Sequence, residues 1–176
     1  MRIIGGTYGG RILQVPKGLP VRPTTDRTKE SLFNILEHRL YWEDSRVLDL
    51  FSGTGNIALE CVSRGAAFVQ AVDRHRKCIS SIERHKKILK ADLPEVLCMD
   101  VWKYVKTSKD RYNLIFIDPP YAMPKQEELL ALIFERNILA EEGLLILEHS
   151  SSLSFSSLPR FSELRKYGSS HLSFFE

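Results

Sequence analysis

Short apolar runs alternate along the chain with stretches in which apolar residues recur every three or four positions. The runs predict buried strands over residues 47–51, 68–72, 96–99, 114–117 and 144–147. The stretches between them predict helices over residues 56–64, 79–89 and 129–134, and the second of these should bury Ile79, Ile82, Ile88 and Leu89. Because the strands are apolar throughout, we predict an α/β fold with a mostly parallel sheet covered by helices on both faces.

The N-terminal part of the chain is rich in glycine and proline. Residues 2–5 and 11–15 predict a short hairpin, and an extended segment follows to residue 24. Thr25 or Asp26 can cap the next helix. The apolar side of that helix is predicted to carry Leu32, Phe33, Ile35, Leu36 and Leu40.

The C-terminal part of the chain also leaves the alternating pattern. Residues 161–167 and 171–175 flank Gly168-Ser169, which predicts a terminal antiparallel hairpin. The length of 176 residues suits one domain with a sizeable core. We therefore expect residues 1–176 to form a single domain, in which residues 1–24 are the N-terminal hairpin and the extended segment.

Composition and charge exclude several classes of protein. No apolar stretch approaches the roughly 18 residues of a membrane helix, and the N-terminus does not resemble a signal peptide, so we expect a cytoplasmic protein. Cys61, Cys78 and Cys98 are odd in number and widely spaced, which argues against disulfides and against a metal site. The net charge of +3 is modest, but basic residues dominate the first 30 positions and indicate contact with phosphates.

A candidate cofactor loop follows the first predicted strand. The spacing Gly53-x-Gly55-x-x-Ala58 lets the backbone turn tightly and approach a ligand at the start of a helix. Asp73 closes the second strand, where it can accept hydrogen bonds from both ribose hydroxyls. Loops of this kind bind NAD or S-adenosylmethionine. Asp49 favours S-adenosylmethionine, because its carboxylate can meet the ammonium of a methionine moiety but would repel a pyrophosphate.

Asp100 follows the third predicted strand and has two interpretations. It can accept a hydrogen bond from the adenine amine of a cofactor, or it can cap a helix that begins at Val101-Trp102. The sequence alone leaves both open.

The residues Asp118-Pro119-Pro120-Tyr121 follow the fourth predicted strand and suit the capture of a flat ring that bears an amine. The Asp118 carboxylate and the Pro119 carbonyl can each accept one amine hydrogen, so that the nitrogen lone pair is directed at a sulfonium methyl. Pro119 and Pro120 fix the backbone, and Tyr121 can stack on the base. Together with the cofactor loop, these residues indicate methyl transfer to the nitrogen of a base.

These motifs resemble the RsmD-type methyltransferases, which modify the N2 of a guanine in 16S ribosomal RNA. The resemblance covers nearly the whole chain, and the Arg-Pro-Thr-Thr-Asp segment at residues 22–26 is its most specific part. It also includes Arg2-Ile3-Ile4-Gly5-Gly6, Gly10-Arg11, the continuation of the specific segment to Asn34, Asp49 through Gly55, Ser63-Arg64-Gly65-Ala66, Asp118 through Tyr121, Glu148-His149 and Tyr167-Gly168.

The resemblance implies a class I methyltransferase fold, Rossmann-like, with seven strands of which the last is antiparallel. It implies S-adenosylmethionine as donor, S-adenosylhomocysteine as product, and a substrate RNA in the small ribosomal subunit or its assembly intermediate. We also expect a monomer. The resemblance implies that the catalytic loop is Asp118, Pro119, Pro120 and Tyr121, and the expected cofactor contacts are Asp49, Phe51, Gly53, Gly55, Asn56, Asp73, Arg74, Asp100, Val101 and Thr25.

The expected RNA contacts lie in the first 30 residues, where the chain departs from the family at one position. Tyr8 stands where the family often has a basic residue, so the grip on RNA is weaker there or the ring stacks on RNA instead. The expected contacts are Arg2, Tyr8, Arg11, Lys17, Arg22, Arg27 and Lys29.

Other functions use part of the same pattern. A DNA adenine or cytosine amino-methyltransferase would share both loops, but the chain has no large insertion for target recognition. A dehydrogenase with NAD would need a hydride-transfer residue, and His149 is the one histidine expected near the crevice. A non-catalytic RNA-binding protein would not need Asp118 through Tyr121. A protein-glutamine methyltransferase usually carries Asn in place of Asp118.

Overall fold

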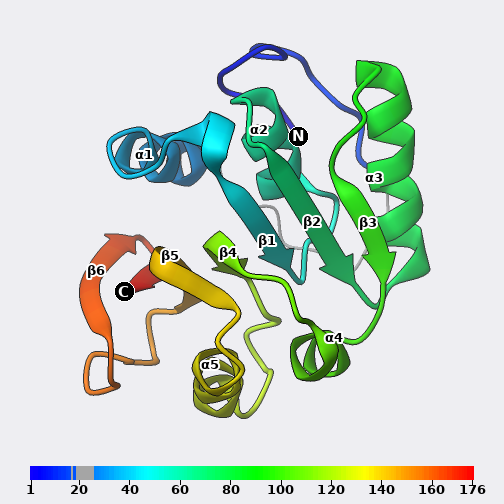
Figure 1. Cartoon of the computed structure of the whole chain (residues 1–176). Coiled ribbons are helices and arrows are strands. Elements are labelled where there is room, and N and C mark those ends of the chain that lie inside the picture. The colour runs from blue at the N-terminus through cyan, green and yellow to red at the C-terminus, as the bar shows by residue number, and fades with distance from the viewer. Residues whose placement is uncertain (17, 19–25) are drawn as a thin grey trace.

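The computed structural model describes residues 1–16, 18 and 26–176, and in these residues seven strands form one mixed sheet (Figure 1). The strand order is β3-β2-β1-β4-β5-β7-β6. Strands β1 to β5 pair in parallel, and β7 lies antiparallel between β5 and β6. The bounds are β1 (Arg46–Leu50), β2 (Phe68–Asp73), β3 (Glu95–Cys98), β4 (Tyr112–Ile117), β5 (Leu139–Ser150), β6 (Phe161–Tyr167) and β7 (Ser170–Phe175).

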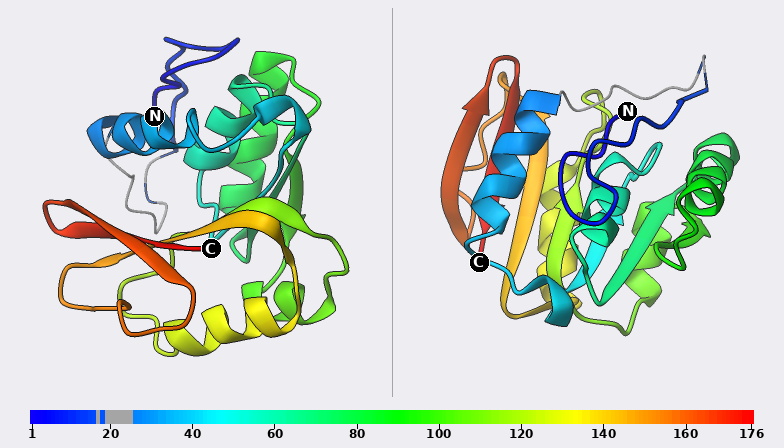
Figure 2. Two further views of the ribbon diagram at one scale, coloured as in Figure 1. Left: turned by 60° about the vertical axis from the view of Figure 1, so that its left-hand side comes forward. Right: turned by 90° about the horizontal axis from the view of Figure 1, so that it is seen from above.

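Helices cover both faces of this sheet, as Figures 1 and 2 show. The helices α1 (Asp26–Leu36), α2 (Asn56–Ser63) and α3 (Arg76–Leu89) pack on one face, and a 3-10 turn, η1 (Trp42–Asp44), precedes β1. The helices α4 (Val101–Thr107) and α5 (Gln126–Glu135) pack on the other. The predicted α/β class and the antiparallel last strand are thus confirmed.

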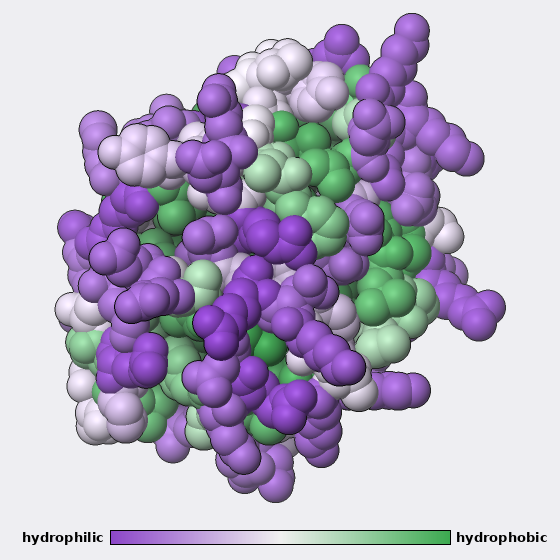
Figure 3. Space-filling view, in the orientation of Figure 1, coloured by the Kyte–Doolittle hydropathy of each residue, from purple (hydrophilic) through white to green (hydrophobic). Residues whose placement is uncertain are grey.

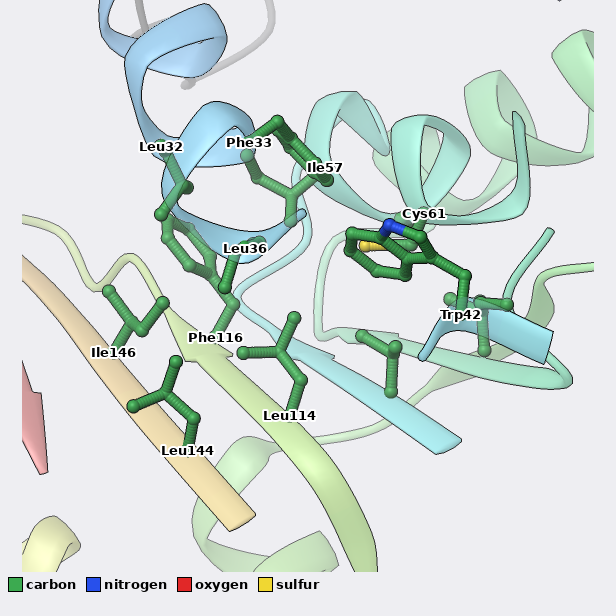
Figure 4. Close-up of a cluster of buried hydrophobic side chains, with 14 of the residues drawn as sticks. Leu32, Phe33, Leu36, Trp42, Ile57, Cys61, Leu114, Phe116, Leu144 and Ile146 are labelled. Carbon is green, nitrogen blue, oxygen red and sulfur yellow. The ribbon is translucent and has the colours of Figure 1, made fainter. Parts of the chain in front are cut away.

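The core is divided between the two faces by the alternation of side chains along each strand. Leu114 and Phe116 of β4 point toward α1 and α2, where they meet Leu36 and Ile57 (Figure 4). Ile115, between them, packs with α4 and α5 on the opposite face. Every central strand is therefore buried on both sides, which explains the continuous apolar runs in the sequence.

The predicted elements correspond closely to the observed ones, with three differences. Strand β5 is longer than the apolar run 144–147, because its first residues continue beside β4 after an irregular register. Leu40 lies beyond α1 and packs against the core from the following turn. The prediction that Ile88 is buried is wrong, since it is 50% exposed on the outer side of α3.

The N-terminal segment forms a turn whose ends are joined by an isolated antiparallel bridge between Arg2 and Ile12. Ile3 and Leu13 are buried against Leu59 of α2 and Leu89 of α3. The hairpin prediction is correct in that the two halves of the segment pair in antiparallel orientation. The paired region is too short to count as two strands. The segment therefore packs on α2 and α3 through a small apolar cluster, which the sequence did not indicate.

Glu60 of α2 fastens this segment to the domain. Its buried carboxylate accepts hydrogen bonds from the backbone N–H groups of Ile4 and Gly5, both at 2.8 Å. It also pairs with Lys29 at 3.1 Å and with Arg64 at 3.1 Å. A network with this many donors satisfies the buried charge.

The surface in the orientation of Figure 1 is mostly hydrophilic, with hydrophobic residues visible between the hydrophilic ones (Figure 3). Among the described residues, no helix has both the length and the apolar character needed to cross a membrane.

Candidate active site

Acidic side chains gather at the carboxyl ends of the central strands, on the face covered by α1, α2 and α3. Asp73, Asp49, Asp118 and Glu148 follow the order of β2, β1, β4 and β5 across the sheet. Each lies two positions after a residue of the core beneath α1 and α2, namely Ala71, Val47, Phe116 and Ile146. Because side chains two apart in a strand share a face, all of these carboxylates project toward the same side.

A cavity of about 620 Å³ opens at this edge, where the strand order reverses between β1 and β4. Ligands of open α/β sheets bind at such switch points. The cavity brings together both motifs predicted from the sequence. Of the predicted residues, those that line it are Asp49, Phe51, Gly53, Asn56, Asp73, Arg74, Asp118, Pro119, Pro120 and Tyr121.

The cofactor loop is held in a conformation that needs positive φ angles. Gly53 has φ 52° and Gly55 has φ 80°, and a Cβ atom at Gly55 would lie 2.9 Å from Ile82 Cγ1. Phe51 adopts φ 59° although it is not glycine, which costs about 1–2 kcal/mol. Strain of this kind is tolerated where the surrounding structure holds the backbone, and it is often found at ligand sites.

Asp73 is the residue that holds this loop. One of its carboxylate oxygens accepts a hydrogen bond from Gly53 N–H at 2.9 Å, and the other accepts from His75 N–H at 2.7 Å. Each carboxylate oxygen can accept a second hydrogen bond. The side chain can therefore fix the loop and still receive the hydroxyls of a ribose.

Asp49 lies at the floor of the cavity and is 2% exposed. Its Oδ2 accepts a hydrogen bond from Ala58 N–H at 3.0 Å, in the first turn of α2. Burial is the largest cause that raises the pKa of Asp49, the Ala58 hydrogen bond lowers it, and the neighbouring Asp73 raises it; together they take the pKa from 3.8 to about 8. A cationic ligand would restore the ionised form, so this position favours an ammonium group.

The loop from Asp118 to Tyr121 forms the other wall of the cavity. Asp118 N–H donates to the carbonyl of Leu50 at 3.4 Å, so the loop leaves the sheet directly beside β1. Pro119 is buried, and the Pro120 carbonyl accepts from Met123 N–H at 2.7 Å in a tight turn. The two prolines therefore stand in a fixed backbone, as predicted.

Gly55, Asp100 and Val101 do not line this cavity, although the sequence placed them among the cofactor contacts. Gly55 shapes the loop from behind, against Ile82. Asp100 is exposed and caps α4 by accepting a hydrogen bond from Lys103 N–H at 3.1 Å, which confirms the capping interpretation. Val101 is buried in the core under α4 and α5. Thr25 lies outside the described residues.

The predicted RNA contacts differ in accessibility. The prediction for Lys29 is wrong, because its side chain is fully buried and its ammonium group serves Glu60, Asn56 and the backbone of Arg2. Arg2, Arg11 and Arg27 are exposed. Tyr8 is half-buried with the Arg11 guanidinium 5.9 Å from its ring centre, and Lys17 and Arg22 lie outside the described residues.

The histidine prediction was also wrong. His149 lies on the opposite face of β5, is fully buried and contacts Ser173 Oγ at 2.8 Å, and burial lowers its pKa. His75 lines the cavity instead. Glu148 lines it too and was missed as a site residue, although its position two residues after Ile146 in an apolar strand could have revealed it.

Comparison with known proteins gives one consistent family. The family model described as Conserved hypothetical protein 95 matches residues 1–176. Ribosomal RNA small subunit methyltransferase D of Escherichia coli is 33% identical over 159 residues, which is 90% of this chain and 79% of that protein. YlbH of Bacillus subtilis, provisionally an rRNA methyltransferase, is 37% identical over 153 residues, or 85% of this chain and 82% of that protein.

Solved structures agree with this result. The yhhF protein of Escherichia coli, provisionally a methyltransferase, superposes with a TM-score of 0.86 at 31% identity, covering 99% of this chain and 96% of that chain. The more distant SMU.776, provisionally a methyltransferase, was solved in complex with S-adenosylhomocysteine. It shares the fold with a TM-score of 0.66 at 20% identity, over 84% of this chain and 49% of that chain.

Proposed function

This chain belongs to the family described as Conserved hypothetical protein 95, the family of the RsmD-type methyltransferases, and from that membership we propose its reaction. It transfers a methyl group from S-adenosylmethionine to the exocyclic N2 amine of a guanine in 16S ribosomal RNA. The substrate is the small ribosomal subunit or its assembly intermediate, and the reaction takes place in the cytoplasm. S-adenosylhomocysteine is the second product.

The observation that carries this proposal is that one cavity contains both loops. Asp49 and Asp73 stand on its β1–β2 side, and Asp118 through Tyr121 stand on its β4 side. Adjacent strands lie about 4.8 Å apart, so the two halves are close enough for a donor and an acceptor to meet. A cofactor loop or an amine-binding loop alone would not support this reaction.

The residues of the first half fit S-adenosylmethionine. The buried carboxylate of Asp49 suits the ammonium of its methionine part, and Asp73 suits its ribose hydroxyls. The positive φ angles at Gly53 and Gly55 bring the backbone close to the ligand. When bound, the cofactor supplies a methyl group on a positively charged sulfur.

The residues of the second half prepare the amine. The amine of guanine is a poor nucleophile, because its lone pair is delocalised into the ring. The Asp118 carboxylate and the Pro119 carbonyl accept its two hydrogens and turn the lone pair toward the cofactor half of the cavity. Tyr121, which follows Pro120 in the same loop and lines the cavity, stacks on the base. Catalysis then rests on positioning and on electrostatic stabilisation of the developing ammonium.

The base must reach this cavity from outside its own stack. Enzymes that modify a base in a paired region extrude it into the active site. Exposed Arg2 and Arg11 on the N-terminal segment are suited to hold the phosphates around it. This assigns the RNA-facing role to the part of residues 1–24 that the structure describes.

The proposal is tested with labelled S-adenosylmethionine and small ribosomal subunits from cells that lack this activity. The product RNA is digested to nucleosides, and the label should appear as N2-methylguanosine. Asp118→Ala serves as the inactive control, with cofactor binding measured in parallel. Label on DNA in a parallel reaction, as N6-methyladenine or N4-methylcytosine, with none on the subunits, would instead support the DNA amino-methyltransferase.

A further inference from the structure

Glu148 stands beside Asp118 at the edge of the sheet. The register of β4 and β5 pairs Ile117 with Leu147, so the next positions along the two parallel strands are Asp118 and Glu148. Both side chains project to the face under α1 and α2, and both line the cavity. Neighbouring strands are about 4.8 Å apart, which is a distance that one base can span with two of its edge groups.

The carboxylate of Glu148 is buried and oriented. Glu148 is 5% exposed, and Ser170 Oγ of β7 donates a hydrogen bond to its Oε1 at 2.6 Å. Ser170 is itself buried at 8% exposure. A carboxylate offers about four acceptor positions, and this bond occupies one of them and orients the group.

The bases that carry an exocyclic amine differ in the ring nitrogen next to it. In guanine, the neighbour N1 bears a hydrogen and is a donor. In adenine and cytosine, the corresponding ring nitrogen is an acceptor with a lone pair. A second carboxylate placed beside the amine-binding Asp118 would therefore accept a hydrogen bond from guanine, but it would face a lone pair in adenine or cytosine.

We propose that Glu148 is the residue that selects guanine, by accepting the N1–H next to the N2 amine held at Asp118. This inference rests on the proposed function, because it assigns the base specificity of the same site. It explains why the site carries a second carboxylate at the base-binding half, where Asp118 and the Pro119 carbonyl already suffice for the amine hydrogens. Cofactor binding needs no part of Glu148, since Asp49 and Asp73 lie on the other side of Asp118 in the sheet.

The test compares guanine with 2-aminopurine at the methylated position. 2-Aminopurine keeps the amine at C2 but has a bare N1 that can only accept a hydrogen bond. Small subunits are reconstituted with 16S RNA carrying either base at the guanine mapped in the wild-type reaction. Single-turnover rates of methyl transfer are then measured with the wild-type protein, with Glu148→Gln, and with Glu141→Gln. The last variant makes the same chemical change at an exposed position of β5.

The wild-type protein and Glu141→Gln should prefer guanine by roughly 10- to 100-fold, the range expected for a hydrogen bond to a charged group. The glutamine of Glu148→Gln can donate its amide hydrogens to the bare N1. Its preference should fall toward one, with slower transfer to guanine and faster transfer to 2-aminopurine. A merely structural role would lower both rates together.

Cofactor binding by Glu148→Gln is measured by calorimetry and should match the wild type, which shows that the variant is folded. A variant that binds cofactor and keeps the wild-type preference for guanine would overturn the role of Glu148 while leaving the proposed reaction intact. Wild-type protein that gives no N2-methylguanosine on unmodified subunits would overturn both. The two failures are distinguishable, because the second uses no variant.

Discussion

Binding of S-adenosylmethionine should release a proton from Asp49. In the free protein, burial raises the pKa of this carboxyl to about 8, so it is neutral at lower pH. The ammonium of the bound cofactor requires the ionised form. The protein must therefore lose a proton whenever the cofactor binds below that pH.

The size of the effect follows from the pKa. At pH 6.5 a group with a pKa of about 8 is almost fully protonated, so about one proton should leave per cofactor bound. The cofactor's own α-amino group, with a pKa of about 7.7–8.0, stays mainly charged at that pH and contributes little. Affinity should rise about tenfold per pH unit up to pH 7, reach a maximum near pH 8, and fall above it as the α-amino group of the cofactor loses its charge.

Calorimetry in two buffers measures this release directly. Titrations at pH 6.5 in phosphate and in Tris should differ in heat by the difference in the buffers' ionisation enthalpies, for about one proton. Asp49→Asn keeps a side-chain acceptor for Ala58 N–H but has no proton to lose. Its heats should agree in both buffers, and its affinity should be about 10- to 100-fold weaker, as for loss of a charged hydrogen bond.

Equal heats for the wild-type protein in phosphate and Tris would refute the reasoning, since they would mean that Asp49 has the same protonation state with and without cofactor. A second consequence concerns stability. A folded pKa raised from 3.8 to about 8 gives a contribution that is fully present below pH 4 and is lost as pH rises through 8. Without cofactor, Asp49→Asn should therefore melt above the wild type at pH 9.

Three other perturbations test the remaining residues. Asp118→Ala should slow methyl transfer by at least about 100-fold with cofactor affinity unchanged, and near-normal turnover would contradict the amine-binding role. Lys29→Met leaves Glu60 without its buried partner and should lower the free energy of unfolding in urea by about 3–5 kcal/mol. A loss under about 1 kcal/mol would show that Arg64 and the backbone donors suffice. Replacing Arg2 and Arg11 by Ala should flatten the dependence of RNA affinity on salt by a slope of about 1.4, and an unchanged slope would place the RNA face elsewhere.

The sheet and the two halves of the site could be predicted from sequence because their signals are local. A continuous apolar run followed by Asp49 or Asp118 specifies both a buried strand and the edge at which its carboxylate emerges. The strand order could not be read in this way, but the switch point follows once parallel strands alternate with helices. The cavity then contains most of the residues that the motifs indicated.

The errors concern side chains whose environment is set by distant parts of the chain. Lys29 looked like a surface charge, because its partner Glu60 lies 31 positions away in another helix. His149 and Glu148 are adjacent in sequence and both match the family, yet they face opposite sides of β5. Successive side chains of a strand point to opposite faces, and this alternation is what distinguishes the two residues. The sequence interpretation did not use it.

The common face of Asp73, Asp49, Asp118 and Glu148 limits how this protein can vary in length. Adding or removing one residue near the end of a strand would turn its carboxylate to the face under α4 and α5, and the site would lose that group entirely. A change in length is harmless only where the carboxylate at the end of the strand still projects from the same face of the sheet. The loops that lead from a helix into a strand meet this condition. Strand β5 contains such a change, since its register against β4 is irregular between Leu139 and Leu144 and regular from there to Leu147. We expect insertions among related chains to spare the strand ends that carry these carboxylates and to occur where they leave the face of each carboxylate unchanged, as at this amino edge.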